Sequence, residues 1–327
     1  MPTLIAPDKF KGTLAAREVA EAIAAGIDGE TDLCPLADGG EGTAEALLGA
    51  LGGGWLERRA SDPLGRPVDC RFALLGNGEA AAIDVAEASG LWRLEADERD
   101  PVEASTAGTG ELIAAAIDAG AKTIYLGCGG SASTDAGVGA LAQFDPSAAE
   151  IVCLCDTKLS FDSAATVFAV QKGADQAIVE GLSARLAQLA ADLPNDPSRL
   201  PFTAAAGGLA GGLWAHGARL ESGPRRILAL LDFARRLARA DLVITGEGRL
   251  DETSLRGKVV GEVAERAAES GTPCWAIVGQ STLVPARARA AGLAGWLEAG
   301  DLGAITSAAT VIAGWQIRSS HERSTDA

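Results

Sequence analysis

The sequence predicts an α/β protein that consists of a discontinuous doubly wound parallel-sheet domain and a second α/β domain inserted into it. Near the N-terminus, the apolar run Thr3–Ala6 is followed by a charged loop and by a helix that extends to about Ile27. Near the C-terminus, the runs Asp241–Ile244 and Cys274–Val278 alternate with helical segments in the same way. Continuous apolar strands that alternate with helices are typical of a parallel sheet covered on both faces.

The helices of this doubly wound domain follow from their own patterns. Val19, Ile23 and Ile27 recur every fourth residue and give the first helix one buried stripe. Near the C-terminus, a helix over about 226–239 is expected before the strand at 241–244, and another helix begins at about Lys258. Both ends of the chain are therefore predicted to contribute to one sheet.

The middle of the chain has a different pattern. Residues 71–75 and 80–85 flank a Gly-Asn-Gly turn, which predicts an antiparallel hairpin. A helix over Glu111–Ala119 then leads into a strand at Thr123–Leu126, and that strand runs into a glycine-rich loop. The middle is therefore predicted to form an α/β domain of its own.

The length of 327 residues, 47% of them hydrophobic, is sufficient for two domains. We assign residues 1–65 and 225–327 to a Rossmann-like or flavodoxin-like domain and residues 66–224 to the inserted α/β domain.

The composition limits the partners and the compartment. The net charge is −16, from 28 basic and 44 acidic residues, and it opposes attraction to nucleic acid and to anionic membrane surfaces. We expect a cytoplasmic protein, because we find neither a signal region nor an apolar run of membrane-spanning length. The cysteines lack the spacing of a disulfide scaffold or a zinc site, so we expect them to be reduced and buried. They are Cys34, Cys70, Cys128, Cys153, Cys155 and Cys274.

The loop Ala37–Thr43 is the first of three glycine-rich candidates for a ligand site. It precedes a helix, so the amides of Gly39 and Gly40 can turn toward an anion at the helix N-terminus. The alternative is a helix-entry turn in which Asp38 or Thr43 acts as a cap.

The second candidate, Gly127–Asp135, includes Gly129, Gly130 and Ser131 and lies between a predicted strand and a predicted helix. Ligands bind beyond the carboxyl ends of the strands in open α/β sheets. The loop also contains the G-x-G-x-x-A spacing of dinucleotide-binding proteins. Because Asp156 lies where an acidic partner is expected, an NAD-dependent dehydrogenase is an alternative.

The third candidate, Thr245–Asp251, follows an apolar strand. Gly246 and Gly248 allow the backbone to approach a ligand closely. A carboxylate from Glu247 or Asp251 can hold Mg²⁺, while Arg249 neutralises phosphoryl charge. The alternative is an internal ion pair between the arginine and a carboxylate.

Basic residues beside the glycines suggest phosphate or carboxylate binding in a chain that is strongly acidic overall. Lys9 and Lys11 follow the first strand, Lys172 lies in the middle of the chain, and Arg249 and Lys258 flank the third loop. The chain lacks both the G-x-x-x-x-G-K-[ST] loop and the protein-kinase signatures, so nucleotide phosphates must be held in another way.

A series of short segments, taken together, resembles one family. The segments are Ala6–Thr13, Ala37–Thr43, Gly108–Ile113, Gly129–Asp135, Gln171–Ala174, Ala206–Leu209, Ile244–Asp251 and Gly257–Lys258. In this order they resemble the bacterial glycerate kinases of the glycerate 2-kinase type. The resemblance implies transfer of the γ-phosphoryl group of ATP to D-glycerate with Mg²⁺, giving 2-phosphoglycerate and ADP, in the cleft of a two-domain α/β protein.

Phosphoryl transfer depends on positioning, on charge neutralisation and on a carboxylate near the attacking hydroxyl. Our hypothesis is that Asp38 or Asp135 accepts the hydroxyl proton, and that Lys11 and Arg249 engage phosphate or the glycerate carboxylate. Asp251 and Glu247 are the predicted metal ligands. The residues predicted to bind substrate or phosphate are Asp8, Lys9, Gly39, Gly40, Gly129, Gly130, Ser131, Lys172, Gly246, Gly248 and Lys258.

Two departures from the family pattern leave alternatives open. The stretch between Ala142 and Ile151 is shortened, and Thr157–Phe161 replaces the usual Asn-Pro turn after Asp156. A kinase of the same fold that acts on another small hydroxy acid or polyol is one alternative. A catalytically inactive protein that binds these ligands is another. A homodimer is also left open.

Overall fold

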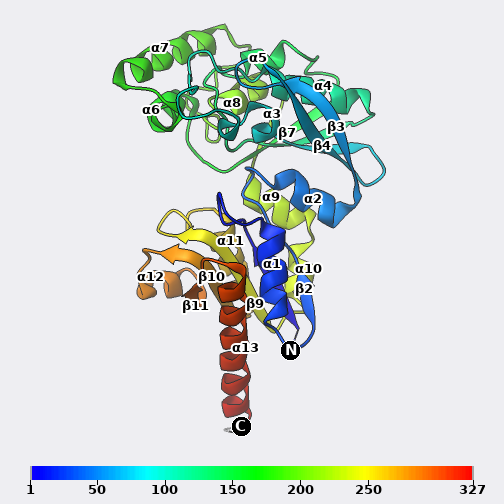
Figure 1. Ribbon diagram of the computed structural model, residues 1–327, viewed down its shortest axis with the longest axis vertical. Coiled ribbons are helices and arrows are strands. Elements are labelled where there is room, and N and C mark those ends of the chain that lie inside the picture. Colours follow the sequence, from blue (N-terminus) through cyan, green and yellow to red (C-terminus); the bar gives the residue numbers. More distant parts are fainter. Residues whose placement is uncertain (1, 326–327) are drawn as a thin grey trace. The chain divides into compact units, whose positions relative to one another are not determined.

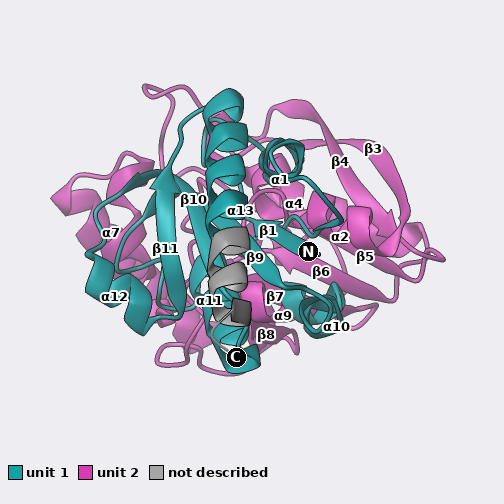
Figure 2. Cartoon of the chain, turned by 90° about the horizontal axis from the view of Figure 1, so that it is seen from below, with its two compact units in different colours: residues 1–37, 227–327 teal, residues 38–226 magenta. Residues whose placement is uncertain are grey.

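The computed structural model describes residues 2–325, and among these the side chains of residues 2–315. The chain divides into two compact units, which Figure 2 shows in different colours. Unit 1 comprises the residues up to Ala37 and those from Ile227 onward, and unit 2 comprises Asp38–Arg226.

Unit 1 contains a five-stranded parallel sheet with the strand order β11-β10-β9-β1-β2 (Figure 1). In order of sequence this is 2-1-3-4-5, the flavodoxin-like doubly wound order. Its elements are β1 (Thr3–Pro7), α1 (Ala16–Ala25), β2 (Thr31–Leu33), α10 (Phe233–Leu237), β9 (Leu242–Leu250), α11 (Val259–Ser270), β10 (Cys274–Ser281), α12 (Pro285–Ala290), β11 (Leu293–Glu298) and α13 (Leu302–Thr325). Helix α9 (Gly223–Leu230) begins in unit 2 and ends in unit 1.

Both faces of the unit 1 sheet are covered. Ile5, Ile244 and Ile277 form one core with residues of α1 and α13, including Ile23 and Ile305. Helix α11 packs on β9 and β10 through its own buried residues. Because each central strand is buried on both sides, it is a continuous apolar run in the sequence.

Unit 2 contains a six-stranded mixed sheet with the order β3-β4-β5-β6-β7-β8. The pairs β3–β4 and β4–β5 are antiparallel, and the remaining neighbours are parallel. Its strands are β3 (Gly53–Ser61), β4 (Pro67–Leu75), β5 (Ala80–Asp84), β6 (Thr123–Gly127), β7 (Glu150–Cys155) and β8 (Arg219–Ser222). Its helices are α2 (Thr43–Leu51), α3 (Val85–Ser89), α4 (Ala107–Asp118), α5 (Val138–Leu141), α6 (Ala164–Phe168), α7 (Gln176–Asp192) and α8 (Leu209–Ala215), with the 3₁₀ turns η1 (Leu91–Arg93), η2 (Phe161–Ser163) and η3 (Val170–Lys172).

The main core of unit 2 lies between its sheet and helices α4 and α8. Phe72, Ile83 and Leu126 from the sheet meet Ile113 and Leu209 from these helices, and all are buried. Helix α2 packs on β4 and β5. The six cysteines of the chain are all buried and unpaired, as predicted.

The fold class predicted from the sequence is confirmed, but the division between units differs at its first boundary. Residues 38–65 belong to unit 2, because β3 pairs with β4 along its whole length, from Gly53 opposite Leu75 to Ser61 opposite Pro67. The second boundary, after Arg226, lies close to the predicted one.

Two predicted elements differ in the structure. The single helix expected over 226–239 is two helices, α9 and α10, because Asp232 adopts the left-handed region with φ of 53° and so interrupts the helix. The loop expected at 245–251 is mostly strand, since β9 continues to Leu250 beside β10. Within residues 2–325, none of the helices combines the length and apolar character that crossing a bilayer requires.

Candidate active site

The order of the unit 1 strands places a topological switch point between β1 and β9. These strands are parallel neighbours, yet helix α1 after β1 and helix α11 after β9 pack into different layers. The connections that leave the carboxyl ends of such strands diverge, and ligands bind in the resulting crevice of open α/β sheets. The first candidate set of residues lies at these two strand ends.

Asp8 begins the loop after β1 and is held by its backbone. Its N–H donates to the Gly246 carbonyl oxygen over 2.8 Å. Its Oδ1 accepts the Lys9 N–H at 2.7 Å, and Lys9 Nζ lies 3.9 Å from the same oxygen. Asp8 and Glu247 are buried, with 7% and 9% of their surface exposed. Adjacent strand ends therefore bring two carboxylates and a lysine to one edge of the sheet.

The glycines of β9 lie in close backbone packing. A Cβ at Gly246 would lie 2.4 Å from the Ile277 carbonyl oxygen, and one at Gly248 would lie 3.2 Å from the Lys11 nitrogen. The loop after β1 therefore lies directly on β9. Phe10 and Leu14 close this loop with a short antiparallel bridge, which leaves Lys11 exposed.

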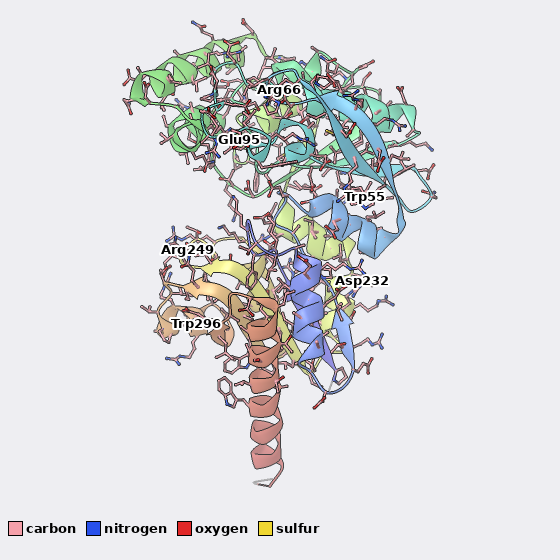
Figure 3. All side chains as sticks on the ribbon, viewed as in Figure 1. Trp55, Arg66, Glu95, Asp232, Arg249 and Trp296 are labelled. Atoms are coloured by element: carbon pink, nitrogen blue, oxygen red, sulfur yellow. The ribbon has the colours of Figure 1, made fainter. Side chains whose placement is uncertain are left out.

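Arg249 and Asp251 lie at the far end of β9, where Figure 3 labels the arginine. Arg249 Nε is 3.6 Å from Asp251 Oδ2, so the predicted alternative of an Asp–Arg ion pair is present. Asp251 Oδ1 accepts the Thr253 N–H at 2.8 Å and the Thr253 hydroxyl at 2.6 Å. These hydrogen bonds hold the pKa of Asp251 below its ordinary value, with a smaller effect from the charge of Lys258. Asp251 is therefore a carboxylate at neutral pH.

The predicted metal ligands fit one mode of magnesium binding. Among the described side chains, those of residues 2–315, no three His, Cys, Asp or Glu side chains lie close enough to hold a metal ion by themselves. Mg²⁺ in phosphoryl-transfer enzymes is commonly bound by one or two carboxylates together with substrate phosphates and water. Asp251 and Glu247 can supply such carboxylates.

In unit 2, the loop before α2 lies along the carboxyl ends of three parallel strands. The Gly129 N–H donates to the Gly39 carbonyl oxygen over 3.2 Å. A Cβ at Gly129 would lie 2.6 Å from the Gly40 Cα, and a Cβ at Gly39 would lie 2.8 Å from the Leu154 carbonyl oxygen. The first two glycine-rich candidate segments are therefore packed against each other, and no larger residue fits at their contact. Asp38 is half-buried in this loop, and its Oδ1 accepts the Gly40 N–H at 3.0 Å.

A carboxylate of unit 2 lies at the N-terminus of α2. Asp84, at the end of β5, accepts the Gly42 N–H at 2.8 Å and the Ala44 N–H at 3.0 Å. The anion expected at this helix end is thus a carboxylate of the protein itself. Asp84 was not among the predicted site residues, although an acidic residue at the end of a predicted strand is a usable signal. Asp156 at the end of β7 is a second such residue, since its Oδ2 lies 3.5 Å from the Cβ position of Gly129.

Asp135 accepts several hydrogen bonds inside unit 2. It is 4% exposed. Its Oδ2 accepts the N–H and the hydroxyl of Thr106, both at 2.8 Å, and the Gly139 N–H at 3.3 Å. Its Oδ1 accepts the Gly137 N–H at 3.2 Å. Both oxygens of Asp135 are therefore engaged in hydrogen bonds within the fold.

Lys172 and Ser131 also lie inside unit 2. Lys172 is 3% exposed, and its Nζ donates to the Ser133 carbonyl oxygen over 2.5 Å and to Ser131 Oγ over 3.2 Å. Burial lowers the pKa of Lys172 to about 8, and the charge of Asp135 raises it in part.

The lowered pKa predicts how Lys172 affects stability. The unfolded lysine keeps its proton up to about pH 10.5, whereas the folded one releases it at about pH 8. The unfolded state binds more protons between these values, so the unfolding free energy contributed by Lys172 rises with pH across this window. At about 1.4 kcal/mol per pH unit, wild type should gain about 3 kcal/mol relative to Lys172→Met. Chemical denaturation at several pH values measures this difference.

The matched control for this measurement is Lys122→Met. Lys122 is 75% exposed and pairs with Glu79, so its removal should produce no such trend. Burial raises the pKa of the Cys34 and Cys274 thiols to about 12. These thiols therefore lower the unfolding free energy as the pH rises, which is opposite to the effect of Lys172. They are common to all variants and cancel in the comparison. A difference that stays flat from pH 8 upward would contradict the lowered pKa.

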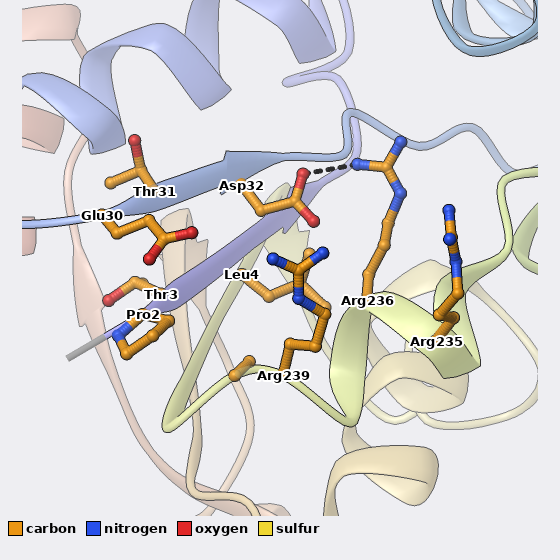
Figure 4. A pocket seen from close by; sticks show the side chains of 10 residues that line it. Pro2, Thr3, Leu4, Glu30, Thr31, Asp32, Arg235, Arg236 and Arg239 are labelled. Atoms are coloured by element: carbon orange, nitrogen blue, oxygen red, sulfur yellow. Dashed lines mark hydrogen bonds and ion pairs between the residues drawn. The ribbon is translucent and has the colours of Figure 1, made fainter.

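A separate pocket of about 370 Å³ lies at the amino ends of β1 and β2, away from the switch point (Figure 4). Arg236 pairs with Asp32 at 2.6 Å, and Arg235 pairs with Asp232 at 2.6 Å. Arg239 and Glu30 also line it. Two of the three arginines are thus paired with carboxylates, and we do not include this pocket in the candidate active site.

The predicted site residues fall into two sets, one for each unit. Unit 1 carries Asp8, Lys9, Lys11, Gly246, Glu247, Gly248, Arg249, Asp251 and Lys258, the last at the N-cap of α11. Unit 2 carries Asp38, Gly39, Gly40, Gly129, Gly130, Ser131, Asp135 and Lys172. The dehydrogenase alternative loses its structural support, because the next helix, α5, begins only at Val138 and has four residues. A dinucleotide fingerprint opens directly into a longer helix.

A doubly wound sheet with charged, glycine-bearing loops at its switch point is typical of α/β proteins that bind a ligand at that point. The glycerate kinase family model matches residues 3–147 and 142–313. The two matched segments overlap at residues 142–147, where the sequence is shortened. The chain therefore belongs to the glycerate kinase family, which confirms the prediction of a kinase.

Individual relatives agree with this assignment. A glycerate kinase from Bacillus subtilis is 36% identical, with 85% of each chain covered. A glycerate 2-kinase from Escherichia coli is 34% identical, with 86% of each chain covered. The crystal structure of a putative glycerate kinase 2 from Salmonella typhimurium is 32% identical, with a TM-score of 0.84 and 99% of each chain covered.

Proposed function

We propose that this protein transfers the γ-phosphoryl group of ATP to D-glycerate with the assistance of Mg²⁺, giving 2-phosphoglycerate and ADP. The observation that carries the proposal is the switch point of unit 1, where Asp8, Lys9, Glu247 and Arg249 gather at adjacent strand ends. Family membership supports a kinase, and the name of the Escherichia coli relative supports position 2 of glycerate.

The reaction needs a proton acceptor, charge neutralisation and positioning from the chain. The C2 hydroxyl oxygen of glycerate forms a bond to the γ-phosphorus, and the bond from that phosphorus to the bridging oxygen breaks as ADP leaves. The hydroxyl proton passes to a carboxylate, for which Asp38 is our candidate. Lys11 and Arg249 would neutralise charge on phosphate or on the glycerate carboxylate. Backbone held rigidly by its glycines supplies positioning.

Asp251 and Glu247 are the residues that we propose to hold Mg²⁺. The lowered pKa of Asp251 keeps a negative charge available at neutral pH. A bound magnesium ion would offset negative charge on the phosphates. The remaining acid-base and positioning roles belong to the protein.

The decisive experiment identifies the product. We expect ADP release with D-glycerate and Mg-ATP in a coupled assay, and a single phosphorylated product assigned to C2 by ³¹P NMR. Release of ADP with no phosphoglycerate would indicate ATP hydrolysis instead. A 3-phosphate product would contradict the proposed position while leaving the kinase reaction in place.

The shortened stretch before Ile151 and the segment Thr157–Phe161 depart from the family pattern. We therefore also test substrates other than glycerate. A panel of small hydroxy acids and polyols should give lower kcat/KM than D-glycerate. A better substrate in this panel would replace glycerate in the proposal. Binding of ATP and glycerate in calorimetry without any turnover would instead show a catalytically inactive protein.

A further inference from the structure

Lys172 is a buried cation at the end of η3. The next residue, Gly173, has φ of 102°, and a Cβ there would lie 2.8 Å from the Arg99 carbonyl oxygen. The chain reverses at this glycine, and the lysine side chain lies inside unit 2 with 3% of its surface exposed. An ammonium group in such a position must be explained, since burial of a charge is costly unless it is hydrogen-bonded.

The hydrogen bonds of Lys172 all lead to one loop. Its Nζ donates to the Ser133 carbonyl oxygen and to Ser131 Oγ, residues that follow β6 and lie far from Lys172 in the sequence. An ammonium group has three donors, and these contacts use two of them. The Ser133 carbonyl oxygen is also enclosed by backbone, because a Cβ at Gly207 would approach it to 2.0 Å.

The rest of the loop shows why this contact matters. Its first half is bound through the backbone, with the Leu91 N–H donating to the Gly130 carbonyl oxygen and the Ala132 N–H donating to the Ser89 carbonyl oxygen, both at 2.9 Å. In its second half, the hydroxyls of Ser133 and Thr134 are fully buried and find no hydrogen-bond partner among the described residues. Lys172 is therefore a side chain that ties the two halves together.

We propose that Lys172 is a positioning residue for phosphoryl transfer, which fixes the loop Gly129–Asp135 from inside unit 2 and does not contact substrate. The inference rests on the proposed function. It changes the role that the sequence suggested for Lys172, because a buried ammonium already bonded to Ser131 and Ser133 acts on ligands only through the loop. Asp135 is the charged group that faces the ammonium.

The kinetic test compares Lys172→Met and Lys172→Arg with Lys122→Met in the full chain. We expect Lys172→Met to lower kcat roughly 10- to 100-fold, because small displacements of positioned groups cost about that much. KM for ATP and for glycerate should stay within about threefold. Lys172→Arg should recover part of the activity and should retain it above pH 8, where wild type declines as Lys172 loses its proton. Lys122→Met should match wild type.

Two outcomes would overturn the proposal. A rise of about tenfold or more in KM for either substrate with unchanged kcat would show direct contact. Unchanged kcat and KM in Lys172→Met would show that the loop does not depend on the lysine. If Lys172→Met does not fold, Ser131→Ala provides the same test, since loss of one acceptor should move the decline of kcat to lower pH.

A second readout does not depend on the substrate. Amide hydrogen exchange of residues 129–135 in ligand-free Lys172→Met should be about tenfold or more faster than in Lys122→Met, because loss of the tie permits local opening. Exchange in β3 and β4 should be unchanged. Equal exchange in the loop would overturn the inference, whereas a wild-type chain that fails to phosphorylate glycerate would count against the proposed function alone.

Discussion

Replacement of Asp38 with asparagine is expected to lower kcat by about 100-fold or more, the usual contribution of a general base, with little change in thermal stability. The asparagine side chain would keep an oxygen for the Gly40 N–H, which is the hydrogen bond that Asp38 Oδ1 accepts within its own loop. It would not accept a proton from the glycerate hydroxyl. Steady-state kinetics with saturating Mg-ATP and glycerate, together with the unfolding midpoint, measure both parts of this expectation.

Asp135→Asn is the matched comparison and should behave in the opposite way. The Asp135 oxygens accept hydrogen bonds from Thr106, Gly137 and Gly139, so an amide NH₂ would be turned toward at least one of these donors. A buried donor without an acceptor costs about 1–3 kcal/mol. We therefore expect a lower unfolding midpoint before any specific loss of chemistry.

The pair of variants separates the two candidates for the base. If Asp38→Asn retains near-normal turnover while Asp135→Asn is inactive with an unchanged midpoint, Asp135 is the base and the structural argument from its hydrogen bonds is wrong. If both remain active and folded, neither carboxylate accepts the proton.

The sequence predicted the unit 1 sheet because its strands are buried on both sides. Ile5, Ile244 and Ile277 belong to continuous apolar runs, which can be recognised as strands without knowledge of the strands they pair with. Strand β3 lacks this signal. It is a mostly exposed edge strand that contains Glu57, Arg58 and Arg59, and only its pairing with β4 places it in unit 2. The first domain boundary was displaced for that reason.

The candidate loops were also predictable, since glycine beside charged residues after an apolar run marks a strand end. Their internal hydrogen bonds were not. Asp84 caps α2 from 42 positions away, and Asp135 reaches back 29 positions to Thr106. Such contacts cannot be inferred from sequence spacing. The sequence therefore predicted that Asp135 and Lys172 act at the ligand site, although both side chains form hydrogen bonds inside the fold.

Arg249 differs from these residues because the fold leaves it available. Its side chain is 60% exposed, and its Nε lies 3.6 Å from Asp251 Oδ2, beyond ordinary hydrogen-bond length. The guanidinium therefore lies near the carboxylate, and this contact does not use up its N–H donors. A planar, permanently charged group at a strand end suits the equatorial oxygens of a phosphoryl group in transfer.

We expect Arg249→Met to lower kcat by about 100- to 1000-fold, which lies at or below the range measured for arginines that stabilise phosphoryl transfer. Arg249→Lys should be intermediate, because lysine keeps the charge but loses the planar pair of donors. The unfolding midpoint should hardly change, since exposed ion pairs contribute about 1 kcal/mol or less. Kinetics and thermal unfolding of the same preparations provide both measurements.

Arg235→Met is the control for the loss of an exposed arginine from unit 1. Arg235 is 77% exposed and pairs with Asp232 at 2.6 Å, so its removal also takes away an exposed charge and one ion pair. Arg235 lines the pocket at the amino ends of β1 and β2, away from the switch point. Arg235→Met should retain full turnover. If Arg249→Met also retains most of its turnover, the arginine serves only its ion pair with Asp251, and the charge that phosphoryl transfer requires must come from the lysines of the β1 loop.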